Sequence, residues 1–295
     1  MKINYKNFDK IVSVDFKKIS LEQIKTIDFW IKRFTPSAKV SEKHKSHYRV
    51  TIKEHKNNCY KELFNHSIIM GKITGNEGAI GKYISQVFQK LVIDQKIIYV
   101  HASCVSKGDN GVIIIGDFGQ GKTSVALECI MQDKKAQLLS DNGIAIKDDK
   151  IIGYANSIAL RTVNTTMLDK INDKEIILKC DNMNFFNFEP NLFDSINIKS
   201  IIIPHLNAED NNIYNVDEEK GKWYLYNKLT SLLNGEAVLF NGSIPTKIFS
   251  TKKNLKIILD EVNTLTKRVP LKYVSCNFNG IVREVLGDLN EKEEL

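Results

Sequence analysis

A glycine-rich stretch in the middle of the chain has the residue types that bind phosphate. Residues 112–123 read VIIIGDFGQGKT, so an apolar run ends in the pattern Gly116-x-x-x-x-Gly121-Lys122-Thr123. Glycines in such a pattern let the backbone turn tightly and bring N–H groups against phosphate oxygens. The lysine adds a positive charge, and the threonine hydroxyl binds magnesium. The spacing therefore predicts a phosphate-binding loop between a strand and a helix.

The whole loop is expected to contact a nucleoside triphosphate such as ATP. Lys122 would stabilise the charge on the phosphates, and Thr123 would hold Mg²⁺. The helix that begins near Lys122 would direct its positive end toward the same anion. The alternative is a chance glycine-rich turn, which the complete match and its flanking elements disfavour. The residues expected to bind the nucleotide here are Gly116, Asp117, Phe118, Gly119, Gln120, Gly121, Lys122, Thr123 and Ser124.

Asp141 is the expected partner of this loop. It ends a short apolar strand expected at 136–140, directly after the loop's helix, and adjacent strands would bring its carboxylate to Thr123. There it could bind Mg²⁺ or accept the proton of an attacking hydroxyl. The alternative is a structural aspartate that caps a turn with Asn142 and Gly143.

His101 is expected beside the loop as well. It lies in a strand expected at 97–105, which a turn at 107–111 joins to the strand that feeds the glycines. In isolation, a histidine in a strand is more often a hydrogen-bonded structural residue. The hairpin would bring His101 next to the loop, and this position favours a catalytic role.

In this order His101, the hairpin, the loop GDFGQGKT and the strand end Ser140-Asp141 resemble the HPr kinase/phosphorylase family, particularly its shorter relatives. The resemblance is convincing over about residues 80–150. It implies a P-loop kinase domain of the HPr kinase and phosphoenolpyruvate carboxykinase-like type, which moves phosphate from a nucleotide to a serine hydroxyl. It also implies that Asp141 activates the acceptor and that His101 lies beside it.

The chain departs from the family pattern at two places. Asn142 stands where the family has the second aspartate of an Asp-Asp pair. Residues 158–162, Ile-Ala-Leu-Arg-Thr, match the family's Leu-Glu-x-Arg-Gly segment without its acid and its glycine. Arg161 is kept and could clamp a phosphate, or it is an ordinary ion-pairing arginine.

Together these residues favour a magnesium-dependent kinase that phosphorylates a hydroxyl, with serine in a peptide or protein as the expected acceptor. Lys122, Asp141 and His101 would be its catalytic residues, and Thr123 and Asp141 its metal ligands. Free serine as the acceptor stays open. A nucleotide-dependent regulator without phosphoryl transfer is the rival interpretation, because one carboxylate of the family pattern is missing.

Net charge and cysteine content limit the classes of ligand and partner that the chain is expected to bind. The chain has 42 Lys and Arg against 35 Asp and Glu, a net charge of +7 that is spread along the sequence. This suits either a basic groove for an anionic ligand or an ordinary lysine-coated surface, and no nucleic-acid-binding signature accompanies it. The five cysteines lie far apart in the sequence and indicate neither disulfides nor a zinc site. The sequence contains no apolar run long enough to predict a membrane span. A cytoplasmic protein is expected, and the family resemblance suggests a homo-oligomer.

The elements needed to position these residues predict an α/β protein in two parts. Residues 1–75 read as a small α+β subdomain that would help to form the acceptor site, and 76–295 as the kinase domain. Apolar periodicity predicts helices near 21–34, 79–94, 122–132, 222–233 and 255–269. A strand at 200–203 is expected to stop at Pro204.

Overall fold

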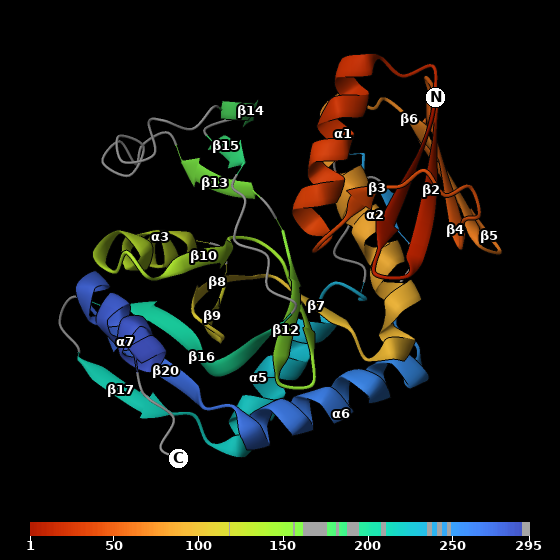
Figure 1. The fold of residues 1–295 in the computed structure, drawn as a ribbon. Coiled ribbons are helices and arrows are strands. Elements are labelled where there is room, and N and C mark those ends of the chain that lie inside the picture. The colour runs from red at the N-terminus through yellow and green to blue at the C-terminus, as the bar shows by residue number, and fades with distance from the viewer. Residues whose placement is uncertain are drawn as a thin grey trace. The chain divides into compact units, whose positions relative to one another are not determined.

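The chain is a mixed α/β protein that forms two compact units (Figure 1). The computed structural model describes residues 1–117, 119–155, 157–161, 176–180, 183–187, 195–207, 211–234, 238–240, 244–246 and 249–290. The first unit contains Met1–Tyr99 and Asn227–Leu259, and the second contains Val100–Tyr226 and Asp260–Leu295. Within the described residues, no helix combines the length and the apolar character that crossing a membrane requires.

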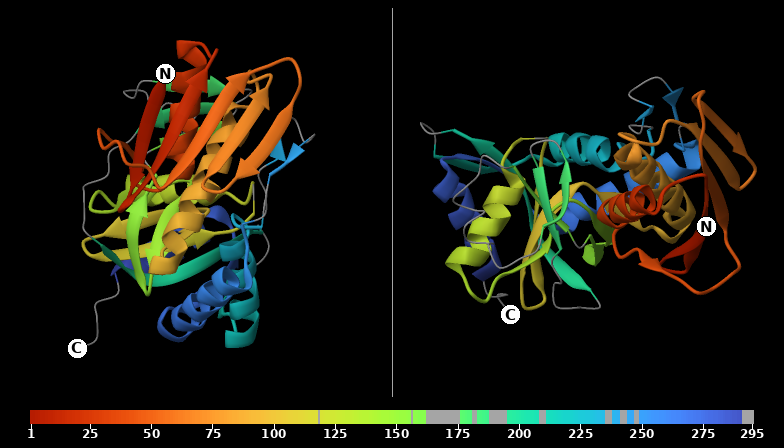
Figure 2. Two further views of the ribbon diagram at one scale, coloured as in Figure 1. Left: turned by 90° about the vertical axis from the view of Figure 1, so that its right-hand side faces the viewer. Right: turned by 90° about the horizontal axis from the view of Figure 1, so that it is seen from above.

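The first unit contains a six-stranded sheet with the order β3-β1-β2-β4-β6-β5. Its strands are β1 (Lys2–Asn7), β2 (Lys10–Lys17), β3 (Lys39–Val40), β4 (Tyr48–Glu54), β5 (Cys59–Leu63) and β6 (His66–Gly71). Helices α1 (Leu21–Phe34) and α2 (Glu77–Val92) pack against each other, and α2 contacts β2. Figure 2, left, looks onto the opposite face of this sheet, which the two helices leave uncovered.

This unit differs from the expected division at residue 75. Helix α2 begins after that boundary, but its apolar side is completely buried within the first unit, for example at Tyr83 and Val87. A helix with a buried apolar face belongs with the elements that cover it. The second segment of the unit, 227–259, follows far along the chain and could not be assigned to it from local sequence.

Local signals set the start of α1. The Ser20 hydroxyl accepts the N–H of Gln23, and the Gln23 side chain accepts the N–H of Ser20, which is a capping box. Ile24, Ile27 and Ile31 then recur at helical spacing and are buried. The expected helix at 21–34 is confirmed.

The central sheet of the second unit has the order β10-β8-β9-β16-β12-β11, and β20 pairs with β16 and with β17. Strand β8 is antiparallel to both β9 and β10, whereas β16 is parallel to β9 and to β20. The strands are β8 (Ala102–Lys107), β9 (Asn110–Ile115), β10 (Gln137–Ser140), β11 (Ile144–Lys147), β12 (Lys150–Tyr154), β16 (Ile196–Leu206), β17 (Asn212–Asn215) and β20 (Leu271–Cys276). Strands β9, β10, β16 and β20 therefore end at one edge of the sheet.

Helices α3 (Lys122–Gln132) and α7 (Phe278–Asn290) pack against each other and against this sheet. The hydrophobic core between them includes Ile114, Val125, Ile202 and Val282. The other described elements are η1 (Ile93–Gln95), β7 (Ile98–Val100), β13 (Ser157–Arg161), β14 (Ile176–Cys180), β15 (Met183–Asn187), α5 (Glu218–Thr230), β18 (Val238–Leu239), β19 (Ile244–Pro245) and α6 (Lys252–Arg268).

The sequence led us to expect that this strand stops at Pro204. Instead, β16 continues to Leu206. The N–H of Ile201 donates to the carbonyl of Pro270, so alternate residues from Ile201 onward direct their nitrogens toward β20. Pro204 is out of phase with these residues, and its nitrogen points toward β9. Strand β9 has already ended at Ile115, and a proline there therefore loses no ladder hydrogen bond.

Candidate phosphate-binding site

The glycine-rich loop joins the end of β9 to the start of α3. Strand β9 is buried along its apolar residues, and the chain turns directly after Ile115. Gly119 and Gly121 have φ of +87° and +77°, which glycine adopts at no steric cost. No atom lies within 4 Å of the position that a Cβ on Gly119 would take. The predicted strand, tight loop and helix are therefore present in that order.

The N-terminus of α3 is open to an anion. Gly121 is its N-cap and supplies no side-chain hydrogen bond, and the first turn has no acidic residue. By contrast, α1 is capped by a serine side chain. The first N–H groups of a helix lack intrahelical partners, and the helix dipole makes this end positive. Lys122, Thr123 and Ser124 form this first turn, and the last two are half-buried.

The Lys122 side chain folds back into the loop. Its Nζ donates to the carbonyl oxygens of Gly116 at 3.1 Å and of Asp117 at 2.9 Å. The residue is only 7% exposed, so the ammonium is held at the base of the loop rather than in solvent. Lysine is a three-donor group, so an ammonium held at this point can also donate to a phosphate oxygen.

One loop amide already binds an oxygen acceptor. The N–H of Asp117 donates to Oε1 of Gln120 at 2.7 Å, and this oxygen lies 2.2 Å from the position that a Cβ on Gly116 would take. This amide therefore points to a place within the loop that an acceptor oxygen can occupy. On α5, burial and the nearby Asp117 carboxylate raise the pKa of Tyr224 to about 12, so Tyr224 is a neutral hydroxyl beside the loop.

Asp141 lies at the same edge of the sheet as the loop. It directly follows β10, which is parallel to β9, but the two strands are not adjacent as expected, because β8 lies between them. Two strand spacings separate their axes by about 9.5 Å. Ser103 of β8 bridges part of this gap, since its hydroxyl lies 3.2 Å from the backbone oxygen of Asp141 and 3.5 Å from Oδ1.

A strand from outside the central sheet fixes the Asp141 carboxylate. The N–H of Ala159 in β13 donates to Oδ2 at 2.9 Å, and Asp141 is only 4% exposed. The turn after β10 is held by another residue, because the Ser140 hydroxyl accepts the N–H of Gly143 at 3.2 Å and donates to its carbonyl at 2.8 Å. Ser140 thus supplies the turn bonds that the structural alternative had assigned to Asp141.

His101 lies in the link between β7 and β8, so the strand expected at 97–105 is interrupted at this residue. The next residue, Ala102, pairs with Ile115, which places His101 level with the start of the loop. Its side chain is exposed. The hairpin thus brings the loop and His101 to the edge at which Asp141 lies.

Of the other expected contacts, Phe118 and the side chain of Arg161 lie outside the described residues. No sequence signal singles out Ser103, the Ala159 amide or Tyr224. Ala159 stands where the family pattern has an acid, and an N–H that contacts Asp141 needs no particular side chain. Tyr224 lies about a hundred residues after the loop, and only the fold brings it near Asp117.

Two side chains at this edge carry oxygen donors of the kind that magnesium takes. Among the described residues, no group of three or more His, Cys, Asp or Glu could hold a metal. Mg²⁺ in nucleotide sites commonly takes one or two protein oxygens, with the remainder from phosphates and water. The Thr123 hydroxyl and the Asp141 carboxylate are hard oxygen donors of this kind.

Comparison with protein-family models and with curated proteins finds no match to this chain.

Proposed function

We propose that this protein is a magnesium-dependent kinase that transfers the terminal phosphate of ATP, or of another nucleoside triphosphate, to a serine hydroxyl of a peptide or protein. The observation that carries the proposal is the sheet edge that Asp141 shares with the loop Gly116–Thr123. A phosphate-binding loop alone serves many activities, but a fixed carboxylate beside it suits activation of an acceptor. The motif order that resembles the HPr kinase family supports the same proposal.

In this proposal the loop binds and orients the triphosphate. The loop amides, the N-terminus of α3 and Lys122 stabilise the negative charge on the transferred phosphoryl group. The Thr123 hydroxyl would hold Mg²⁺, which would neutralise charge on the phosphates. Positioning and charge stabilisation are the main contributions that an enzyme makes to phosphoryl transfer.

Asp141 orients the acceptor and takes its proton. The acceptor oxygen forms a bond to the terminal phosphorus, and the bond from that phosphorus to the bridging oxygen breaks. The acceptor proton passes to the carboxylate of Asp141, whose Oδ2 accepts the N–H of Ala159 and whose Oδ1 lies 3.5 Å from the Ser103 hydroxyl. The nucleoside diphosphate leaves with the electron pair of the broken bond. His101 lies at the same edge and would hold the acceptor or Asp141 in place.

The test is transfer of labelled phosphate. Purified protein is incubated with Mg²⁺ and terminally labelled ATP, with or without peptides encoded beside its gene and with free serine. Label in a peptide supports the proposal, and label in free serine alone would replace the peptide acceptor with a small molecule. Asp141→Asn should lower the transfer rate by about 10²- to 10⁴-fold while ATP affinity changes little, because a general base acts on the chemical step.

A nucleotide-dependent regulator is the second candidate. Asn142 and Ala159 favour it, because each stands where the resembled family has a carboxylate. A regulator would bind ATP tightly and transfer label to neither acceptor nor water. Its partner binding would survive in Asp141→Asn, whereas a kinase would lose turnover in the same variant.

A further inference from the structure

The six-stranded sheet of the first unit has a face that its helices do not cover (Figure 2). Residues directly opposite each other in neighbouring strands share a face, and the side chains of one strand alternate between faces. The pairs Lys2 with Asp15, Asp15 with Thr51, and Thr51 with Ile68 run across this uncovered face. The alternate residues, such as Val14 and Val50, are completely buried on the helix side.

This uncovered face is strongly basic. The chain as a whole has 42 basic and 35 acidic residues, whereas strands β1, β2, β4 and β5 bring six basic side chains to this face against the single acid Asp15. An even lysine coat would not produce this imbalance on one side of one sheet. The basic residues are Lys2, Lys6, Lys17, Arg49, Lys53 and Lys61.

A cavity of about 220 Å³ opens beside this face, lined by Ser46, His47, Tyr48, Arg49, Asn65 and His66. His47 is fixed by β2, since its Nδ1 accepts the N–H of Ile11 at 3.0 Å, and in the neutral ring the proton is therefore on Nε2. Nε of Arg49 lies 3.7 Å from the Asp15 carboxylate. The cavity thus combines a permanent cation with two imidazoles, which suits a carboxylate.

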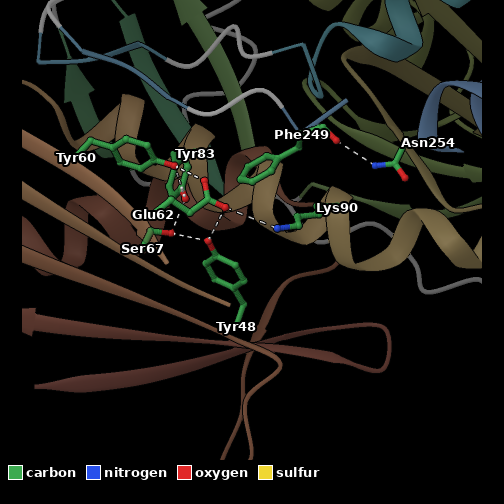
Figure 3. A network of polar contacts seen from close by, with 8 residues as sticks. All are labelled: Tyr48, Tyr60, Glu62, Ser67, Tyr83, Lys90, Phe249 and Asn254. Atoms are coloured by element: carbon green, nitrogen blue, oxygen red, sulfur yellow. Dashed lines mark hydrogen bonds and ion pairs between the residues drawn. The ribbon is translucent and has the colours of Figure 1, made fainter. Parts of the chain in front are cut away.

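The wall of this cavity rests on a buried hydrogen-bond network (Figure 3). The Tyr48 hydroxyl lies 2.8 Å from the Ser67 hydroxyl, which lies 2.5 Å from the Tyr83 hydroxyl. Tyr60 donates to Glu62 at 2.9 Å, and Lys90 lies 3.8 Å from the same carboxylate. Burial raises the pKa of Tyr48 and of Tyr83, so both are neutral hydroxyls at physiological pH. This network therefore holds Tyr48, one of the residues that line the cavity.

The side chains around this face favour a peptide over a nucleic acid. Single-stranded nucleic acids stack successive bases on several aromatic rings, whereas the strand residues of the uncovered face include no Phe, Tyr or Trp in this fully described sheet, and Phe64 in the β5–β6 turn is a single ring beside them. At the β5–β6 turn, however, Leu63 is 45% exposed and Phe64 is 94% exposed, next to Asn65 of the cavity. Exposed apolar side chains beside a basic surface suit a segment with both acidic and apolar residues.

We propose that the uncovered face of the first unit, with its cavity at His47, Arg49 and His66, docks an acidic, partly apolar segment of the peptide or protein acceptor. This inference rests on the proposed kinase function for its biological role, but peptide binding can be measured without turnover. The face would hold the acceptor by charge and by its apolar rim.

The test uses a fluorescein-labelled decapeptide of alternating glutamate and leucine, with a lysine–leucine decapeptide for comparison. Fluorescence anisotropy measures the affinity of the full-length protein at low and at physiological salt. The main variant is Lys17→Glu with Lys53→Glu, since these residues lie opposite each other on the uncovered face. The matched control is Lys25→Glu with Lys256→Glu, which makes the same change in charge at exposed helix positions of the same unit. Lys17→Gln with Lys53→Gln replaces the main variant if that variant fails to fold.

The wild-type protein should bind the acidic peptide at least tenfold more tightly than the basic one. The main variant should lose at least tenfold in this affinity, and the control less than twofold. Equal losses in variant and control would overturn the proposal, because they would reflect net charge alone. Tighter binding of a labelled 15-nucleotide single strand, lost in the same variant, would also overturn it in favour of a nucleic acid. ATP affinity should be unchanged in all variants, and failure of the wild type to bind ATP would overturn the kinase proposal separately.

Discussion

Gly121 and Gly108 both have a left-handed backbone, but their surroundings differ. Gly121 has φ of +77°, and a Cβ on it would lie 3.1 Å from Cδ1 of Leu206. Gly108 has φ of +58° in the turn between β8 and β9, and no atom lies within 4 Å of the equivalent position. Alanine would therefore strain the backbone at both sites. Only at Gly121 would its Cβ also crowd a neighbouring side chain, that of Leu206.

We expect Gly121→Ala and Gly108→Ala each to lower the free energy of unfolding by about 1–2 kcal/mol, the usual penalty for a left-handed non-glycine residue. Only Gly121→Ala should also weaken Mg-ATP binding, by about tenfold or more, because the loop amides would no longer converge on the phosphates. Urea unfolding and calorimetric titration measure the two effects. Wild-type ATP affinity in Gly121→Ala would contradict the assignment of the loop.

At the scale of elements, a charged cluster attaches α7 to the central sheet. Lys272 of β20 donates to Glu284 at 2.7 Å and to Asp288, and Asp288 also accepts the hydroxyl of Ser200. Burial by itself would lower the pKa of Lys272, but its hydrogen bonds to the two carboxylates outweigh burial and raise it. Asp288 is buried, so its charge depends on these partners.

Lys272→Met should lower the free energy of unfolding by about 3–5 kcal/mol, because it leaves a buried carboxylate unpaired. Lys220→Met, which removes an exposed pair with Asp217, should change it by less than about 1 kcal/mol.

Since folding raises the pKa of Lys272, its contribution to the free energy of unfolding is complete below the unfolded pKa of about 10.4 and is lost as pH rises through the folded pKa. Urea unfolding from pH 8 to 11 measures this, and an unchanged midpoint in Lys272→Met would refute the cluster's role.

Elements with local signals could be predicted from the sequence. The bounds of α1 and α3 match those expected, because a capping box starts one and the glycine-rich loop starts the other. The continuation of β16 through Pro204 depends on where a neighbouring strand ends, which local sequence does not encode. The environment of Asp141 was equally inaccessible, because its carboxylate is fixed by a backbone N–H of β13.

At the scale of the whole molecule, the first unit is completed by a distant segment. The Gln86 side chain of α2 donates to the carbonyl of Leu232 at 2.8 Å, and the rings of Tyr83 and Phe249 lie 6.1 Å apart. The division expected at residue 75 would therefore cut through a packed core. The role in acceptor binding that we propose for residues 1–75 is therefore better tested by substitutions on the uncovered face than by a deletion.

A truncated protein that starts at residue 76 should lose the fold of the first unit. Ile80, Tyr83 and Val87 are completely buried and would be exposed once the sheet is removed. We expect aggregation or rapid proteolysis within 76–99 and 227–259, which limited proteolysis with mass spectrometry would detect. A soluble truncated protein that resists protease in both segments would contradict the observed division.

The two-segment composition of the first unit also has a consequence during synthesis. Its first 99 residues leave the ribosome early, but the unit is complete only when Leu259 has been made. At about 5–20 residues per second, the wait between residues 99 and 227 alone takes about 6–26 seconds. For that time the nascent chain exposes the surface around Tyr83 that Phe249 later contacts.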